Sequence, residues 1–134
     1  MAVYLLDLDG FKPVNDQHGH DVGDELLRAV AHRLRAQIPA SDMVARLGGD
    51  EFVLMSRGLR TEADAQRMGQ RLLTAFAQPF QVGLQRLQVG LTIGYAVAPL
   101  DGHEAVELIK AADAAMYCGK QEGKHCLRRA AGWV

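Results

Sequence analysis

The stretch Leu47-Gly48-Gly49-Asp50-Glu51-Phe52 places two carboxylates in a turn between two apolar runs. Those runs, residues 44–47 and 52–55, predict short strands, and a Gly-Gly pair between such runs is typical of a hairpin. The glycines permit positive φ in the turn and, because they lack Cβ, let a ligand approach the backbone. Two adjacent carboxylates repel each other unless a cation neutralises them. The stretch therefore predicts a metal and phosphate site, with a solvated acidic hairpin tip as the alternative.

Length and composition limit the class of protein. The 134 residues predict a single domain, residues 1–134, with one core, and 49% hydrophobic with 23% charged residues is typical of a globular chain. The 15 basic and 16 acidic residues leave a formal net charge of -1. This balance argues against nucleic-acid binding through bulk charge, so we expect no nucleic-acid partner and local recognition of any bound phosphate.

The cysteines and the amino-terminal stretch bear on the cellular compartment. Cys118 and Cys126 have no pattern of paired spacings and predict reduced thiols in a cytoplasmic protein. Residues 2–6 are apolar, but they follow no basic region and end at Asp7, so they predict a buried strand and neither a signal peptide nor a membrane span. We therefore expect a cytoplasmic, excised domain without membrane contact of its own, with any sensor or membrane tether outside residues 1–134.

Hydrophobic periodicity predicts alternating strands and helices. Besides the hairpin around Gly48, the expected strands are residues 2–8, 80–82, 87–97 and 126–129. The expected helices are residues 22–37, 61–76 and 104–120. Residues 80–82 and 87–97 would pair as a second hairpin. This order of elements predicts an α/β (α+β) sandwich, in which helices pack on one mixed sheet.

Local signals refine these helices. Asp21 with Asp24, and Thr61 with Asp64, have the spacing of capping boxes at the starts of the first two helices. In the last helix, Val106 lies on the predicted apolar face, and residues 116–117, Met-Tyr, are expected in the core.

Three stretches carry a resemblance to a known family. Residues 48–52 read GGDEF, residues 7–24 contain DLDGFKPVND and GHDVGD, and residues 112–117 read ADAAMY, with Lys120 and Gly123 after them. In order and spacing they resemble the GGDEF domains, which are diguanylate cyclases, from about residue 1 to residue 124.

The resemblance implies a fold in which distant residues meet. The family has a palm-like βαββαβ core, shared with nucleotidyl cyclases and polymerase palms, with the first strand beside the central GGDEF hairpin. Asp7 would then lie next to Asp50 and Glu51.

A metal site at Asp7 is also expected on chemical grounds. Asp7 ends a buried strand, where a carboxylate needs a partner or a metal ion. A calcium loop is excluded because Gly10 stands at loop position four instead of six and His18 replaces the final glutamate. Mg²⁺ (or Mn²⁺) held by carboxylates and by triphosphate oxygens suits the chemistry. The ligands that the resemblance implies are the Asp7 side chain, the Leu8 backbone carbonyl, Asp50 and Glu51.

The implied reaction joins two GTP molecules into cyclic di-GMP and releases pyrophosphate. A 3′-hydroxyl attacks the α-phosphorus of the other nucleotide, and such in-line displacement needs positioning and charge neutralisation. Asp50 or Glu51 would accept the hydroxyl proton, and Lys12 would assist at the phosphates. Because the product joins two identical units by two equivalent bonds, we expect a homodimer, a second copy of the domain facing the first.

The resemblance also implies the substrate-binding residues. Asn15, His20 and Asp24 would read guanine, whose N1-H, N2-H₂ and O6 suit a carboxylate and an amide, although Asp24 has the competing role of helix cap. A solvated lysine is the alternative for Lys12, and Arg46 would contact either phosphate or a structural ion-pair partner. The full expected set is Phe11, Lys12, Asn15, His20, Asp24, Gly48, Gly49, Lys120 and Lys124.

Some residues depart from the family pattern. The usual arginine and asparagine after Lys120 are replaced by Lys124 and His125, so the bidentate guanidinium is lost. Pro39 stands where an inhibitory product site has arginine, and the family's usual amino-terminal turn segment is absent. The prediction is a diguanylate cyclase; the alternative is a catalytically inactive GTP- or cyclic di-GMP-binding regulatory domain attached to a phosphodiesterase domain.

Overall fold

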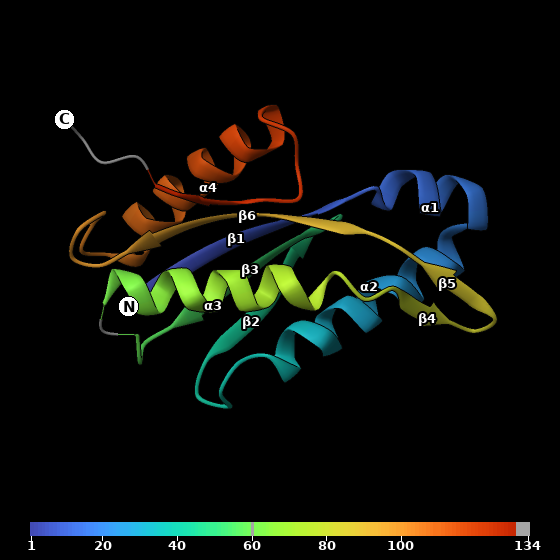
Figure 1. Ribbon diagram of the computed structural model, residues 1–134, viewed down its shortest axis with the longest axis horizontal. Helices are drawn as coiled ribbons and strands as arrows, with labels where there is room; N and C mark the ends of the chain where they lie inside the picture. Colours follow the sequence, from blue (N-terminus) through green and yellow to red (C-terminus); the bar gives the residue numbers. More distant parts are fainter. Residues whose placement is uncertain (60, 131–134) are drawn as a thin grey trace.

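One mixed sheet organises the computed structural model, which describes residues 1–59 and 61–130. The strands of this sheet are β1 (Ala2–Asp9), β2 (Met43–Gly48), β3 (Glu51–Ser56), β6 (Gly90–Val97) and β7 (Leu127–Arg129), in the order β2-β3-β1-β6-β7. Neighbouring strands are antiparallel except β6 and β7, which run parallel. The expected mixed sheet and the position of the first strand beside the hairpin are both confirmed (Figure 1).

Helices cover both faces of this sheet. They are α1 (Phe11–His18), α2 (His20–Ala36), α3 (Glu62–Ala75) and α4 (Ala105–Gln121). Figure 1 shows α4 on one side of β6 and β1, and α2 with α3 on the other. The α/β sandwich is therefore confirmed. None of the helices that the structure describes is long and apolar enough to cross a membrane.

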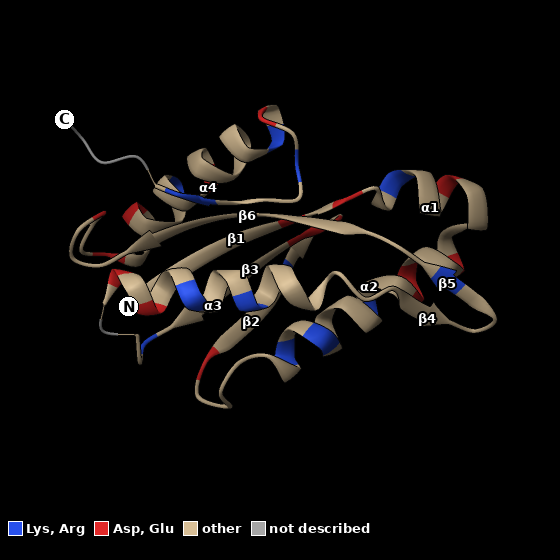
Figure 2. Cartoon of the chain, viewed as in Figure 1, with Lys and Arg blue, Asp and Glu red and all other residues tan. Residues whose placement is uncertain are grey.

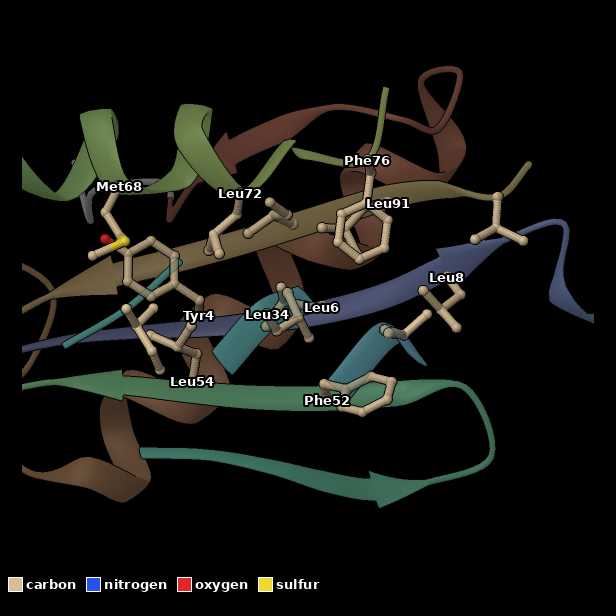
Figure 3. Packing of buried hydrophobic residues seen from close by; sticks show 14 of the residues in the cluster. Tyr4, Leu6, Leu8, Leu34, Phe52, Leu54, Met68, Leu72, Phe76 and Leu91 are labelled. Carbon is tan, nitrogen blue, oxygen red and sulfur yellow. The ribbon is translucent and has the colours of Figure 1, made fainter. Parts of the chain in front are cut away.

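The central strand β1 explains why its sequence is a continuous apolar run. Val3 and Leu5 pack under α4, whereas Tyr4 and Leu6 belong to the larger cluster beneath α2 and α3 (Figure 3). Both faces of β1 are thus covered, and apolar residues are needed at every position instead of every second one. The Tyr4 hydroxyl, which is buried, donates to the Ala65 carbonyl at 2.7 Å.

The segment after β1 differs from the prediction. A loop was expected up to residue 21, but α1 forms directly after Gly10, whose φ is 87°. Pro13 lies in the first turn of α1, where a missing N–H does no harm. The helix α2 begins at His20 after Gly19, and no side chain caps it, so the predicted Asp21–Asp24 capping box is wrong.

The predicted second hairpin is also wrong. Residues 80–82 form β4 (Phe80–Val82), but its partner is β5 (Gln85–Leu87) in a separate two-stranded sheet. The β6 strand starts at Gly90 and pairs with β1. Seven of its eight residues are buried, and a strand covered so completely belongs beside other long strands, not beside a three-residue partner at the surface.

The cap of α3, the last strand and the buried face of α4 were also predicted from the sequence. The Thr61 side chain accepts a hydrogen bond from Asp64 N and caps α3, as expected. The short last strand is confirmed by β7. On α4, Met116 is buried as expected, whereas Val106 and Tyr117 are 61% and 65% exposed. The face of α4 that packs on the sheet is instead Leu108, Ala112, Ala115, Met116 and Gly119.

The helix α4 lies unusually close to β6 because of one glycine. A Cβ atom at Gly94 would lie 2.1 Å from the Ala112 carbonyl oxygen and 2.3 Å from Met116 N. Only a residue without a side chain permits backbone contact of this kind. Gly94 therefore fixes the height of α4 above the sheet.

Candidate active site

The pairing of β1 with β3 brings the acidic residues together. Asp7 lies opposite Glu51 in this register, and Leu8 N donates to the Asp50 carbonyl at 3.1 Å. In Figure 2 the acidic segments of β1 and β3 lie beside each other. Asp7 lies 43 residues before Asp50 and 44 before Glu51 in sequence, so the neighbourhood that the family resemblance implied is produced by sheet pairing.

The turn between β2 and β3 is built as its glycines suggested. Gly48 and Gly49 have φ of 149° and 53°, in the region that favours glycine. Arg46 Nε donates to the Gly49 carbonyl at 2.9 Å, so the Arg46 side chain braces the turn. This contact is not the structural ion pair considered for Arg46, and the phosphate contact stays a prediction.

The Asp7 carboxylate lies in an unfavourable environment. Burial raises the pKa of Asp7 to about 6, with further upward contributions from Asp50 and Glu51 and an opposing one from Lys120. The Oδ1 atom of Asp7 is buried and has no hydrogen-bond partner among the residues that the structure describes. A buried carboxylate oxygen without a donor and beside another carboxylate is the position at which a cation would be most stabilising.

Lys120 is the cation nearest to these carboxylates. It projects from the last turn of α4, and its Nζ lies 2.5 Å from Asp9 Oδ1, 3.3 Å from the Leu8 carbonyl oxygen and 3.6 Å from Asp7 Oδ2. The predicted helical pairing of Lys120 with Lys124 does not occur, because α4 ends at Gln121 and Lys124 has φ 64°.

Asp9 is a site residue that sequence reasoning missed. Its carboxylate accepts from Thr92 Oγ1 at 2.8 Å and from His125 N at 2.8 Å, in addition to Lys120. Burial alone would raise the pKa of Asp9, but these hydrogen bonds outweigh it and lower the pKa below its ordinary value. The available signal was the spacing of two from Asp7, which places both side chains on one face of β1.

The residues around Asp7 fit a divalent cation. Asp7 Oδ1, the Asp50 carboxylate and the Leu8 carbonyl are hard oxygen donors, and Mg²⁺ commonly takes only one or two carboxylates and completes its shell with phosphates and water. Within the described part of the chain, no three or more His, Cys, Asp or Glu side chains converge as a complete metal cage. A site of this type would therefore depend on the nucleotide for its remaining ligands.

The helices α1 and α2 meet at a tight corner that holds four predicted substrate contacts. Asn15 Nδ2 and His20 Nδ1 are 3.1 Å apart across Gly19. A Cβ at Gly23 would lie 2.1 Å from Asn15 Oδ1 and would also meet the Phe11 ring, so Gly23 allows α1 to fold onto α2. Lys12 is exposed, and its Nζ lies 3.4 Å from Asp16 Oδ2.

A groove of about 360 Å³ lies between α2 and β2. It is lined by Asp24, Leu27, Arg28, Ala31, Val44, Ala45, Arg46 and Phe52. Of these, Asp24 was predicted to read guanine, and Arg46 was a candidate for a phosphate contact. Helical periodicity placed Leu27 in the core, but no sequence signal told which strand α2 would face, so the apolar walls and Arg28 were missed.

The comparisons with known proteins agree with this architecture. The family model described as "Diguanylate cyclase, GGDEF domain" matches residues 1–126. The bifunctional diguanylate cyclase/cyclic di-GMP phosphodiesterase MucR of Pseudomonas aeruginosa is 47% identical over 92% of the chain, which spans only 18% of the length of MucR.

Two solved structures have the same fold. The GGDEF domain of TpbB from P. aeruginosa superposes with a TM-score of 0.93 at 37% identity, over 97% of this chain and 76% of that one. An EAL/GGDEF domain protein from M. capsulatus gives a TM-score of 0.89 at 40% identity, over 97% and 84% of the two chains. The chain belongs to the GGDEF family of diguanylate cyclase domains.

Proposed function

We propose that this domain makes cyclic di-GMP from two molecules of GTP in the presence of Mg²⁺ or Mn²⁺ and releases pyrophosphate. The observation that carries the proposal is the Asp7 carboxylate, whose buried Oδ1 has no donor among the residues that the structure describes. Asp50 is its acidic neighbour, and the Leu8 carbonyl contacts the same lysine, Lys120, as Asp7. Structural carboxylates are ordinarily paired within the protein. A carboxylate with one oxygen left without a donor, beside a Gly-Gly turn, is suited to a cation that arrives with a polyphosphate.

Asp7, the Leu8 carbonyl and Asp50 would hold the metal ion, with Glu51 next to them. When bound, the metal neutralises phosphate charge and favours ionisation of the attacking hydroxyl. The 3′-oxygen of one GTP forms a bond to the α-phosphorus of the other as the bond to pyrophosphate breaks. The proton of that hydroxyl passes to Asp50 or Glu51. Lysine side chains would bind the departing phosphates.

The lysines differ in their readiness for this role. Lys120 is already at the site, with Nζ 3.3 Å from the Leu8 carbonyl oxygen. Lys12 and Lys124 are exposed, and the weak pairing of Lys12 with Asp16 leaves it available to a phosphate. The backbone around Phe11 and the turn at Gly48 and Gly49 would approach the phosphates closely.

The groove between α2 and β2 is suited to the guanine base. Its apolar walls, among them Leu27 and Phe52, would cover the faces of a purine, and Asp24 at the rim would accept from N1-H and N2-H₂. The Asn15–His20 pair lies at the neighbouring corner of α1 and α2. It would contribute further polar contacts to the nucleotide.

Two copies of the domain are required for this reaction. Each copy has one such groove and one acidic site, and the two new phosphodiester bonds of the product are equivalent. We therefore expect a monomer in dilute solution whose specific activity rises with protein concentration. Initial rates over a dilution series, with light scattering in parallel, measure this. A specific activity that stays constant while only monomer is present would contradict a two-copy mechanism.

A regulatory domain that binds GTP without turnover is the second candidate. The exposed Lys124, which stands in place of the family's arginine, favours it because a lysine cannot form the bidentate contact to phosphate. The similarity to MucR, which carries two activities, is compatible with either role.

The decisive experiment is incubation with GTP and Mg²⁺, followed by chromatography for cyclic di-GMP, with Asp50→Asn as the matched control. Product with the parent protein and none with Asp50→Asn supports the cyclase. Nucleotide binding without product in either protein supports the regulatory domain.

A further inference from the structure

Lys120 contacts two of the groups that would hold a metal ion at this site. Its Nζ contacts the Leu8 carbonyl oxygen at 3.3 Å and Asp7 Oδ2 at 3.6 Å, and these are two of the proposed metal donors. We propose that Lys120 is an internal cation that competes with the divalent metal for these oxygens, and that Asp9 is the positioning residue that keeps Lys120 there. The inference rests on the metal site of the proposed function.

The hold of Asp9 on Lys120 is stronger than the other contacts of Lys120. Nζ donates to the Asp9 carboxylate, which is only 10% exposed, whereas its contact to Leu8 is to an uncharged carbonyl at 3.3 Å and its contact to Asp7 is 3.6 Å long. Charge-assisted hydrogen bonds of this kind are about twice as strong as neutral ones. Asp9 therefore anchors the ammonium, whereas the Leu8 and Asp7 contacts are exchangeable.

Asp9 is itself fixed from two other elements. The Thr92 hydroxyl on β6 and the backbone N–H of His125 both donate to it, each at 2.8 Å. His125 is held in turn, since its Nδ1 accepts from Leu91 N at 3.2 Å. Thr92 and His125 thus hold the Asp9 carboxylate in place. Lys120 can move away from the Leu8 carbonyl by rotation of its own side chain while it keeps its contact with Asp9.

The Lys120 ammonium and a divalent metal ion should exclude each other because both are positively charged. An ammonium and a divalent ion that both contact the Leu8 carbonyl and Asp7 would lie a few ångströms apart, where like charges repel strongly in a partly buried site. Without nucleotide, Lys120 lowers the affinity for the metal. With nucleotide, the triphosphate offers Lys120 another anionic partner, so metal and GTP should promote each other's binding.

The test is Mn²⁺ binding without nucleotide, measured by the electron paramagnetic resonance signal of free Mn²⁺. Lys120→Met should tighten Mn²⁺ binding about tenfold because a repelling unit charge is removed. Lys110→Met is the matched control: it removes the same charge from the exposed face of the same helix and should change the affinity less than about twofold. Unchanged or weaker Mn²⁺ binding by Lys120→Met, including undetectable binding by both proteins, overturns the proposal.

The role of Asp9 is tested by a double-mutant cycle. In an Asp9→Asn background Lys120 is no longer anchored, so Lys120→Met should improve Mn²⁺ affinity by less than about threefold. A full tenfold gain in that background would show that Asp9 does not position Lys120. Circular dichroism checks folding, and Lys120→Gln, which keeps a hydrogen-bond donor toward Asp9, serves as a second variant with the same expected gain.

Failure of the metal site itself gives a different result. Asp50→Asn should remove most Mn²⁺ binding in both the parent and the Lys120→Met backgrounds. If Mn²⁺ binds equally well after Asp50→Asn, the ion lies elsewhere, and the metal assignment of the proposed function fails. If Asp50→Asn weakens binding but Lys120→Met does not tighten it, only the competition is wrong.

Discussion

Two charged clusters lie at opposite ends of the same sheet, and they are built differently. At one end, Asp7 and Asp9 contact Lys120, with Asp50 and Glu51 as the acidic neighbours of Asp7. Within the described part of the chain, Asp7 Oδ1 has no hydrogen-bond donor. We call these five residues the acidic site.

At the other end, Glu62, Tyr95, Asp101 and Arg129 form what we call the closed network. The Tyr95 hydroxyl donates to Glu62 at 2.9 Å, and Arg129 contacts Asp101 at 3.2 Å and Glu62 at 3.4 Å. Asp101 also accepts from Val97 N at 2.8 Å. Each carboxylate in this cluster is matched within the protein.

The difference separates two uses of charged side chains. In the closed network each acid has a donor, so the network joins α3, β6 and β7 and contributes to stability. In the acidic site four acids face one lysine, so the protein alone leaves repulsion that an added cation would relieve. Substitutions in the closed network should lower stability, and substitutions in the acidic site should change activity.

The largest expected effect is on turnover by Asp50→Asn. The substitution removes a proposed metal ligand from a half-buried turn, so cyclic di-GMP formation should fall by about a hundredfold or more. The melting temperature should not fall, because the change relieves repulsion with Asp7. Product chromatography and thermal unfolding on the same preparations measure both. Full activity in Asp50→Asn would contradict the assignment of activity to the acidic site.

Asp101→Ala should cost the most stability. The Asp101 side chain is 3% exposed, and its loss leaves Arg129 partly unpaired and Val97 N without its acceptor. The free energy of unfolding should fall by about 2–4 kcal/mol. The cyclase rate measured well below the melting temperature should stay near that of the parent. Urea denaturation gives the first quantity; a loss of rate equal to that of Asp50→Asn would contradict the separation.

The pH dependence of stability should reveal the repulsion at Asp7. Because its pKa is raised to about 6 from 3.8, the folded chain holds a proton between these values that the unfolded chain has released. The stability of metal-free protein should therefore fall as pH rises from about 4 to 6. Asp7→Asn should remove this slope and add about 1–2 kcal/mol at pH 7. Unfolding in EDTA at several pH values measures it, and a parallel slope in Asp7→Asn would assign the effect to other groups.

The smallest effect is expected for Tyr95→Phe. It removes only the hydroxyl that donates to Glu62, while Arg129 still contacts that carboxylate. Burial, with the bond to Glu62, raises the pKa of Tyr95, so the phenol stays protonated throughout the range in which the enzyme would be assayed. A loss of about 0.5–1 kcal/mol is expected, with unchanged activity. A loss as large as that of Asp101→Ala would show that the network depends on the phenol.

The sequence predicted the hairpin and the long helices because each has a local signal. Gly48 and Gly49 mark the turn, and α2, α3 and α4 each bury a face with helical period. The helix α1 was missed because none of its eight residues is buried, so it lacks an apolar stripe. A helix of that length is held by its neighbours, through the contact that Gly23 allows.

The anchor of the site was missed for a different reason. Asp9 meets Thr92 across 83 residues and His125 across 116, and these contacts exist only after β6 and the chain following α4 have been placed. The resemblance to the family supplied Asp7, Asp50 and Lys120. It offered no indication that Lys120 would rest on the Leu8 carbonyl.

The close backbone contact at Gly94 gives α4 a point about which the helix could tilt as a rigid body. The backbone contact of Gly94 with Ala112 and Met116 is the natural pivot, and Lys120 lies about six residues, or roughly 9 Å, further along the helix axis. A tilt of about ten degrees would move the base of Lys120 by roughly 1.5 Å relative to the Leu8 carbonyl. A force on the far end of α4 would thus be transmitted to the end that carries Lys120 without any change within the sheet.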